Sequence, residues 1–278
     1  MKKWHMIIDV EKCEDCNNCF LACKDEFVGN EWTGYSAPQP LHDHRWINIH
    51  RKERGAFPYV DVAYLPIPCM HCKEAPCIEA GKGAVIRRPD GIVIIDPEKA
   101  KGNAELIASC PYNAIFWNEE LALPQKCTFC AHLLDKGWEM PRCVHSCPTG
   151  ALRVEHVEDA KMERIAAEES LEILYGELGS RPNVYYKNLF RFEKCFIAGS
   201  VDAIKNDVVD CVEGARVLLS KDGATIAETT TDNYGDFRFD GLTGDGSSYA
   251  VVVESDGYEA KTLTVVVSDS VNMGNIRL

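Results

Sequence analysis

Residues 13–23 read Cys13-Glu14-Asp15-Cys16-Asn17-Asn18-Cys19-Phe20-Leu21-Ala22-Cys23. This C-x-x-C-x-x-C-x-x-x-C spacing is typical of proteins with two iron–sulfur cubes, because three of the thiolates bind one cube and the fourth binds the other. The second half of such a two-cluster unit follows more than a hundred residues later, in Cys127-Thr128-Phe129-Cys130 and Cys143-Val144-His145-Ser146-Cys147-Pro148. Cross-pairing of the halves predicts two ligand sets, named here after their first cysteine: the Cys13 set (Cys13, Cys16, Cys19 and Cys147) and the Cys23 set (Cys23, Cys127, Cys130 and Cys143).

A further block of cysteines lies between these halves. It supplies the Cys69 set (Cys69, Cys72, Cys77 and Cys110). If this set binds one cube, the block is a second copy of the two-cluster unit in which only one site has kept its ligands. The positions expected for the other four ligands hold Gly81, Ala100, Asn103 and Leu106, none of which can bind iron. Because these four ligands are absent together, we predict three [4Fe-4S] clusters with four cysteine ligands each.

Two other uses of cysteine compete with this interpretation. A disulfide framework is typical of short secreted domains that carry a signal peptide, and this chain of 278 residues is neither short nor led by such a signal. Structural zinc also uses C-x-x-C pairs, but it does not call for a C-x-x-C-x-x-C-x-x-x-C run or for the Cys-Pro endings at Pro111 and Pro148. The spacing therefore favours cubane clusters.

The composition restricts the partners and the compartment. A net charge of −13 and the lack of a basic stripe argue against nucleic acid. We find no apolar run of the roughly 20 residues that a membrane-spanning helix needs. The start of the chain has an aspartate where the apolar part of a signal peptide should continue. We therefore expect no transmembrane segment and a cytoplasmic protein, with the reservation that a folded subunit can be exported together with a partner.

The pattern of the chain changes near residue 195. Residues 1–195 hold the cluster motifs and predict a tandem ferredoxin-like domain of the bacterial dicluster type. Residues 196–278 predict an all-β sandwich or small barrel, so that the fold class is α+β. In this second part, short alternating runs are separated by turn signals and predict strands at 215–219, 225–230, 236–239, 249–253, 262–267 and 275–278.

Local patterns also predict several elements of the first part. Residues 4–10 alternate as a strand does, and residues 45–52 and 59–65 form the two arms of a predicted hairpin around Gly55 and Pro58. Residues 157–178 show helical spacing of apolar side chains, followed by Gly179 as a stop signal. Residues 182–186 are expected to run back across the ferredoxin-like core.

Residues 1–195 resemble the iron–sulfur β-subunits of molybdopterin oxidoreductases of the dimethyl-sulfoxide-reductase class. Most members of that family carry four cubes, so the residues at 81, 100, 103 and 106 are a departure from its pattern. The resemblance includes Asp15-Cys16-Asn17-Asn18-Cys19-Phe20, Cys69-Met70-His71-Cys72, Asp90-Gly91-Ile92-Val93 and the stretch 185–194. It implies a large catalytic partner that binds a molybdenum bis(molybdopterin guanine dinucleotide) centre. It also implies a carboxypeptidase-regulatory-like or Cna-B-like sandwich for the C-terminal domain.

The expected role is electron transfer between the partner and other redox groups, with no catalytic residue in this chain. Three clusters with an appended β domain are similar to the pattern in transhydroxylases of polyhydroxylated aromatics, which is the first hypothesis. The alternative is the electron-delivering subunit of a reductive catechol dehydroxylase or of another molybdopterin oxidoreductase. A third class of explanation is a structural subunit whose clusters only rigidify the fold.

Overall fold

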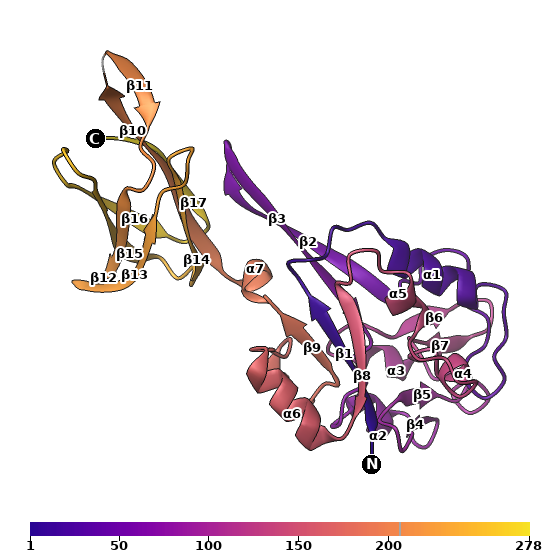
Figure 1. The fold of residues 1–278 in the computed structure, drawn as a ribbon. Coiled ribbons are helices and arrows are strands. Elements are labelled where there is room, and N and C mark those ends of the chain that lie inside the picture. Colours follow the sequence, from indigo (N-terminus) through magenta and orange to yellow (C-terminus); the bar gives the residue numbers. More distant parts are fainter. Residues whose placement is uncertain (206) are drawn as a thin grey trace. The chain divides into compact units, whose positions relative to one another are not determined.

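The computed structural model describes residues 1–205 and 207–278 (Figure 1). The chain divides into two compact units, and each contains two segments of sequence. The first unit consists of residues 1–51 and 64–189, and the second of residues 52–63 and 190–278. The second unit thus begins a few residues before the predicted boundary at 195 and includes the tip of the predicted hairpin.

A three-stranded sheet runs through the first unit. Its central strand β1 (Lys3–Asp9) pairs antiparallel with β8 (Leu152–Val157) and parallel with β9 (Val184–Lys187). Helix α6 (Asp159–Glu168) packs on this sheet, because Met162 is fully buried against Ile7. The predictions of a strand near residues 4–10 and of a segment returning across the core are confirmed.

The predicted helix over residues 157–178 is wrong beyond Glu168. The backbone turns left-handed at Ser170, with a φ of 53°, which an α-helix does not tolerate. Glu172 then exchanges two backbone hydrogen bonds with Tyr186, of 2.7 and 2.8 Å, and so pairs with the end of β9. Only a short 3-10 helix, η1 (Gly176–Leu178), follows. Of the later apolar residues, Leu171 packs beside Met162, Leu174 is buried and Leu178 is exposed, so they do not form one helical face.

Short helices, two-stranded hairpins and the loops beside them surround the cysteines of the first unit. The helices are α1 (Asn18–Phe27), α2 (Pro76–Ala80), α3 (Glu105–Ala108), α4 (Ala131–Leu134) and α5 (Arg142–His145). The hairpins pair β2 (Ile47–Ala56) with β3 (Tyr59–Pro68), β4 (Val85–Arg87) with β5 (Val93–Ile95), and β6 (Phe116–Asn118) with β7 (Leu123–Gln125). In α1 the buried side chains are Cys19, Cys23 and Phe27, which share one face because they are four residues apart.

The second unit is an all-β sandwich of two sheets. One sheet has the order β11-β10-β14, with β17 also paired to β10, and the other has the order β13-β12-β15-β16. Their bounds are β10 (Cys195–Lys205), β11 (Val208–Cys211), β12 (Arg216–Lys221), β13 (Ala224–Thr230), β14 (Asp236–Leu242), β15 (Ser247–Glu254), β16 (Lys261–Val267) and β17 (Val271–Arg277). The six strands predicted from sequence are confirmed, whereas β10 and β11 were missed. A short helix, α7 (Phe190–Glu193), precedes β10.

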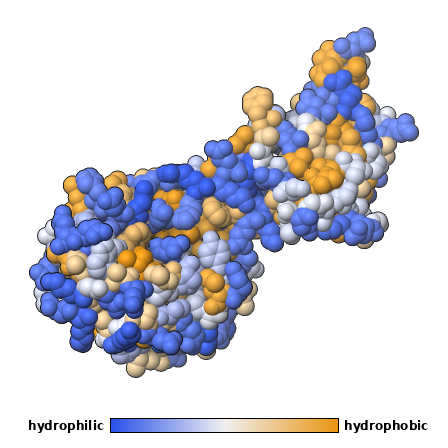
Figure 2. Space-filling model, turned by 180° about the vertical axis from the view of Figure 1, so that it is seen from behind, coloured by the Kyte–Doolittle hydropathy of each residue, from blue (hydrophilic) through white to orange (hydrophobic). Residues whose placement is uncertain are grey.

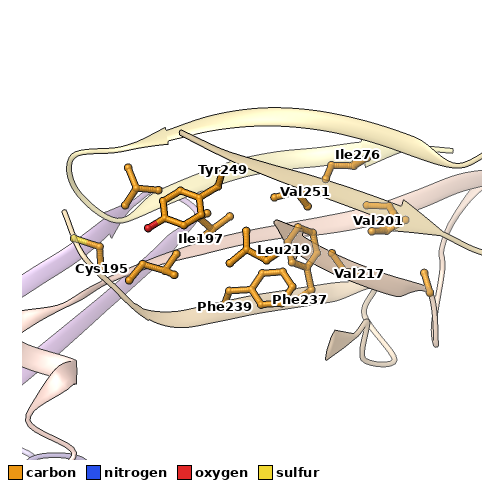
Figure 3. Packing of buried hydrophobic residues seen from close by; sticks show 14 residues of the cluster. Cys195, Ile197, Val201, Val217, Leu219, Phe237, Phe239, Tyr249, Val251 and Ile276 are labelled. Atoms are coloured by element: carbon orange, nitrogen blue, oxygen red, sulfur yellow. The ribbon is translucent and has the colours of Figure 1, made fainter. Parts of the chain in front are cut away.

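Alternate side chains of these strands fill one apolar core (Figure 3). Val217 and Leu219 from β12 meet Phe237 and Phe239 from β14 there, as expected for facing sheets with a two-residue repeat. Cys195 lies in this core, whereas Cys211 is exposed. The β10–β11 hairpin carries exposed apolar side chains at Ile204, Val208 and Val209 (Figure 2).

A buried arginine ties the β2–β3 tip into the second unit. The Arg54 side chain is fully enclosed, donates hydrogen bonds to Asp61 and Asp240, and lies over the Phe196 ring at 5.4 Å. Burial alone would raise the pKa of Asp61, but hydrogen bonds from Arg238 and Arg54 lower it to about 2. Asp61 is therefore ionised at neutral pH, and its negative charge compensates the buried charge of Arg54.

Candidate iron–sulfur centres

The Cys69 set lines one cavity of the first unit. Cys69 and Cys72 lie in the loop after β3, Cys77 is on α2, and Cys110 follows α3. The space between the lining atoms is about 350 Å³, and the lining includes Ile115 and Tyr112. Segments more than thirty residues apart thus bring four sulfur atoms to one space.

The Cys23 set lines a second cavity of nearly equal size, about 360 Å³. Cys23 comes from α1, Cys143 from α5, and Cys127 and Cys130 from the loop between β7 and α4. The surrounding side chains are apolar and include Phe27, Trp46, Phe129 and Met6. Apolar walls of this kind give the low-dielectric surroundings that a buried redox centre requires.

The Cys13 set lies nearer the surface. Cys19 interacts electrostatically with Cys13, Cys16 and Cys147, and Cys13 does so with Cys147 and Cys16. Cys16 is exposed, Cys13 and Cys147 are partly exposed, and Cys19 is buried. Of the three sets, this one is therefore the most accessible to solvent.

Burial makes these thiols reluctant to ionise without a metal. It is the main cause that raises the pKa of Cys19 and Cys72 to about 12 and that of Cys77 and Cys127 to about 11. It also raises the pKa of Cys23, Cys130, Cys143, Cys13 and Cys110. Neighbouring sulfurs add to the effect through repulsion between like charges. A cation that binds thiolate directly would remove this penalty, because a coordinating thiol is deprotonated by its metal.

Backbone amides point at some of the sulfur atoms. The N–H of Phe129 donates to Cys127 Sγ at 3.3 Å, and the N–H of Ala114 donates to Cys110 Sγ at 3.4 Å. Such N–H to sulfur bonds stabilise negative charge on the ligands of a cluster and are one means of setting its potential.

The C-x-x-C loops at 13–16, 69–72 and 127–130 share a backbone feature that the sequence did not reveal. In each, the residue before the second cysteine has a positive φ: 54° at Asp15, 44° at His71 and 57° at Phe129. The corresponding position of the loop at 100–103 is Gly102, with a φ of 79°. The loop that lacks ligands has therefore kept the left-handed turn of the loops that have them.

Apolar packing fills the region where the absent fourth set would converge. Ala100 and Leu106 are fully buried in a hydrophobic cluster with Val85, Ile95 and Leu123. Gly81 lies against the same cluster, since a Cβ atom there would stand 2.5 Å from Val85 Cγ2. Apolar side chains therefore occupy the space beside three of the four positions, 81, 100 and 106.

The cysteine sets differ from a site for one ion. Among the described residues, no three His, Cys, Asp or Glu side chains are grouped as they would be around a single metal ion. In a [4Fe-4S] cube each of the four cysteines binds a separate iron, so that the two kinds of site have different spacing. The fourteen cysteines, all of them described, form no disulfide.

Two family models match the chain. Residues 60–157 match the 4Fe-4S dicluster domain, and residues 197–278 match the carboxypeptidase regulatory-like domain. The chain is similar over its full length, and that of the relative, to the pyrogallol hydroxytransferase small subunit of Pelobacter acidigallici, with 47% identity over 281 residues. The chain belongs to the iron–sulfur subunits of molybdopterin oxidoreductases.

More distant relatives agree with this family. A tetrathionate reductase subunit of Salmonella typhimurium is 32% identical over 193 residues, which cover 67% of this chain and 73% of the relative. A putative iron–sulfur subunit of dimethyl sulfoxide reductase from Halobacterium salinarum is 32% identical over 217 residues, or 68% and 80% of the two chains. This iron–sulfur subunit is thus an electron-transfer protein with [4Fe-4S] clusters, and the predicted family and fold class are confirmed. No helix among its described residues is long and apolar enough to cross a membrane.

The sequence interpretation missed two polar residues of this iron–sulfur subunit that line the Cys69 cavity. His71 is buried and neutral, because burial holds its pKa well below the ordinary value. Lys126 is also buried; burial lowers its pKa, but the sulfurs of Cys69, Cys77 and Cys127 raise it above the usual value. Their positions beside ligands, within Cys69-Met70-His71-Cys72 and directly before Cys127, were the only available signal.

Proposed function

We propose that this chain is the electron-transferring small subunit of a hydroxytransferase-like molybdenum enzyme and that it binds three [4Fe-4S] clusters, one in each cysteine set. The observation that carries the proposal is the convergence of twelve cysteines into three groups of four. Two groups line cavities of nearly equal volume, and the third forms one set of mutually interacting thiols.

An orphaned polar atom fits the presence of a cluster in the Cys69 cavity. The N–H of Val93 donates to Nδ1 of His71 at 3.0 Å, so the proton of the neutral imidazole is on Nε2. Nε2 is buried and has no hydrogen-bond partner among the described residues. A buried donor without an acceptor is costly, and a sulfur atom of a cluster in the cavity that His71 lines would supply one.

The residues of this chain would hold the three sites in a fixed order. Cys19 and Cys23 both lie on α1, so the Cys13 set adjoins the Cys23 set. Cys69 and Cys127 interact electrostatically, so the Cys23 set also adjoins the Cys69 set. When bound, the clusters supply one-electron transfer. The protein contributes the ligands, the apolar walls that exclude water from the two inner sites, and the order in which the Cys23 set stands between the others.

The partner and reaction class are proposed from the full-length similarity. The match to the pyrogallol hydroxytransferase small subunit includes the C-terminal β domain, whereas the two reductase subunits cover about two thirds of this chain. We infer a large subunit that binds the molybdenum bis(molybdopterin guanine dinucleotide) centre and transfers hydroxyl groups on a polyhydroxylated aromatic. Catalysis belongs to that subunit, and we assign no catalytic residue here. Because ligand thiols must stay reduced, the cytoplasm is the compartment we propose.

A reductive role is the second candidate. Two relatives of about one-third identity carry the names of reductase subunits, and a catechol dehydroxylase would consume electrons in the same way. The distinction lies in the balance of the reaction, since hydroxyl transfer between aromatics requires no net electrons and reductive dehydroxylation requires two per hydroxyl group removed.

The first test is iron content and spectroscopy of the purified full-length chain with any co-purifying subunit. Three cubes predict about twelve irons per chain and three reducible signals in electron paramagnetic resonance during dithionite titration. Sixteen irons, eight irons or bound zinc would contradict the cluster count. Clusters that take up no electrons would favour the structural role. Identification of a large molybdenum-containing chain in the same preparation would support the proposed partner, and its absence would count against it.

The second test separates the two reactions. The complex is incubated with pyrogallol or catechol, once without and once with an external one-electron donor. The proposed function predicts that pyrogallol is converted to another trihydroxybenzene without the electron donor. Conversion only with the donor, and with loss of a hydroxyl group, would identify the reductive enzyme instead.

A further inference from the structure

Lys126 places a positive charge in the interior of the first unit, beside two of the cysteine sets. Its side chain is 3% exposed and lies in the wall of the Cys69 cavity. The ammonium donates hydrogen bonds to the carbonyl oxygens of Val93 and Cys127, the latter at 3.1 Å, and it also interacts with the Cys69 sulfur. Two carbonyl groups thus hold the ammonium in place, and its charge lies beside a ligand of the Cys69 set.

Sulfur atoms are the main electrostatic partners of Lys126. The strongest are those of Cys69, Cys77 and Cys127, and Lys126 also acts on Cys110 and on the neutral His71. A buried ammonium is tolerated only where an opposite charge compensates the loss of water. Carbonyl dipoles provide part of this compensation, and the ligands of the two adjoining sets would provide the rest once a bound cluster holds them as thiolates.

The Cys69 and Cys23 sets adjoin beside Lys126. Cys69 and Cys127 interact electrostatically with each other, and both interact with the ammonium of the residue before Cys127. Two of the three sulfurs that act most on the ammonium belong to the Cys69 set, and one belongs to the Cys23 set. The Cys13 set is not among its partners. A charge at this position therefore acts most strongly on one site, less on the second and least on the third.

We propose that Lys126 is a fixed cation that raises the reduction potential of the cluster held by the Cys69 set and, to a smaller extent, of the cluster held by the Cys23 set. The inference rests on the proposed three-cluster function. It assigns the tuning of cluster potentials to a residue that is not itself a cluster ligand. Reduction adds one negative charge to a cluster, without bond formation, and a nearby positive charge stabilises the reduced form more than the oxidised form. Lys126 would thereby favour the residence of electrons at the two inner sites.

The test is a redox titration of the full-length chain, in its complex, followed by electron paramagnetic resonance with dithionite as reductant. Lys126→Met removes the charge and keeps an unbranched side chain, and Lys126→Gln also retains a hydrogen-bond donor. A Cys110→Ser variant identifies the signal of the Cys69 set. We expect Lys126→Met to lower the equilibrium constant for reducing that cluster about tenfold, or about 59 mV for a one-electron couple. The Cys23 set should shift less and the Cys13 set not measurably.

Lys73→Met is the matched control. Lys73 directly follows Cys72, a ligand of the same set, but its ammonium pairs with Asp159 at 3.0 Å, so its removal should leave all potentials unchanged. Equal shifts at all three clusters, or none in Lys126→Met and Lys126→Gln, would overturn the proposal. Loss of iron from both variants would also overturn it, because Lys126 would then serve assembly. If the unsubstituted protein lacks three reducible clusters, the proposed function itself fails, which the same titration shows before any variant is compared.

Discussion

The loops at residues 69–72 and 100–103 have the same left-handed turn, but only the first contains cysteines. In the first, His71 precedes Cys72 with a φ of 44°, and the loop borders a cavity lined by four thiols. In the second, Gly102 precedes Asn103 with a φ of 79°, and the loop borders a packed apolar cluster that contains Ala100 and Leu106. Cys77 and Ile115 belong to both regions and form the wall between them.

The comparison separates backbone conformation from ligand chemistry. The turn persists at Gly102 although no thiol is there to be oriented, so it does not depend on a bound cluster. The interior beside each loop must still be filled, because empty space forfeits dispersion contacts. Leucine, valine and isoleucine side chains fill it at one loop. At the other, the thiol-lined cavity of about 350 Å³ is the place we assign to a cluster. The two regions should therefore respond differently to removal of iron and to truncation of a buried apolar side chain.

The largest expected effect comes from removal of iron. Oxidative treatment with a chelator should abolish the cooperative unfolding of the first unit, because the binding free energy of a structural metal centre is folding free energy. The second unit should keep its own unfolding transition, since its core is an apolar cluster of strands β10 to β17. Hydrogen exchange resolved by peptide measures both in one experiment. Retained protection of the peptides around Cys69 and Cys127 in iron-free protein would contradict this expectation.

Much of this contrast could be read from the sequence, and some of it could not. The spacing of cysteines and the block of positions without ligands at 81, 100, 103 and 106 predicted which regions would differ. The confirmed fold class followed from the change of pattern near residue 195. The ligand sets stay predictions, although the structure brings the thiols of each set together.

What the sequence did not reveal depends on long-range contacts. The role proposed for Lys126 requires knowledge that the Val93 carbonyl oxygen, some thirty residues away, accepts a hydrogen bond from its ammonium. A lysine before a C-x-x-C pair is equally compatible with an exposed side chain. Strand β11 was missed because all of its residues are exposed, so it lacks the alternation that marks a strand with one buried face. The helix predicted over residues 157–178 ends early because the backbone turns at Ser170 and Glu172 pairs with Tyr186, a long-range contact that the apolar spacing does not reveal.

The next effect concerns the apolar region. Leu106→Ala should lower the free energy of unfolding of the first unit by about 2–5 kcal/mol, because it removes a fully buried side chain and leaves a cavity among Val85, Ile95 and Leu123. Denaturant titration of the iron-loaded protein measures it. Leu121→Ala, at a side chain that is 37% exposed, is the control and should change stability by no more than about 0.5 kcal/mol. Iron content should be unchanged in both, and loss of iron from Leu106→Ala would mean that the apolar cluster supports the Cys69 site directly.

The smallest expected effect is an unchanged iron content. A variant with cysteine at all four vacant positions, Gly81→Cys, Ala100→Cys, Asn103→Cys and Leu106→Cys, should still bind about twelve irons per chain, as three cubes require. The turn at Gly102 is present, but the space is not: a Cβ at position 81 would stand 2.5 Å from Val85 Cγ2 and 2.9 Å from the Cys77 carbonyl oxygen.

Metal analysis of the same variant with Val85→Ala added decides whether packing is the obstacle. A rise above twelve irons only when Val85 is shortened would show that side-chain volume, and not the backbone, excludes a fourth cube. If the four cysteines alone raise the iron content to about sixteen per chain, the apolar side chains can rearrange around a metal centre. The absence of ligands, and not the packing, would then explain the missing cluster. If neither variant gains iron, the backbone around Gly81 has itself moved away from a cluster-binding conformation, and the shared turn at Gly102 is all that remains of the fourth site.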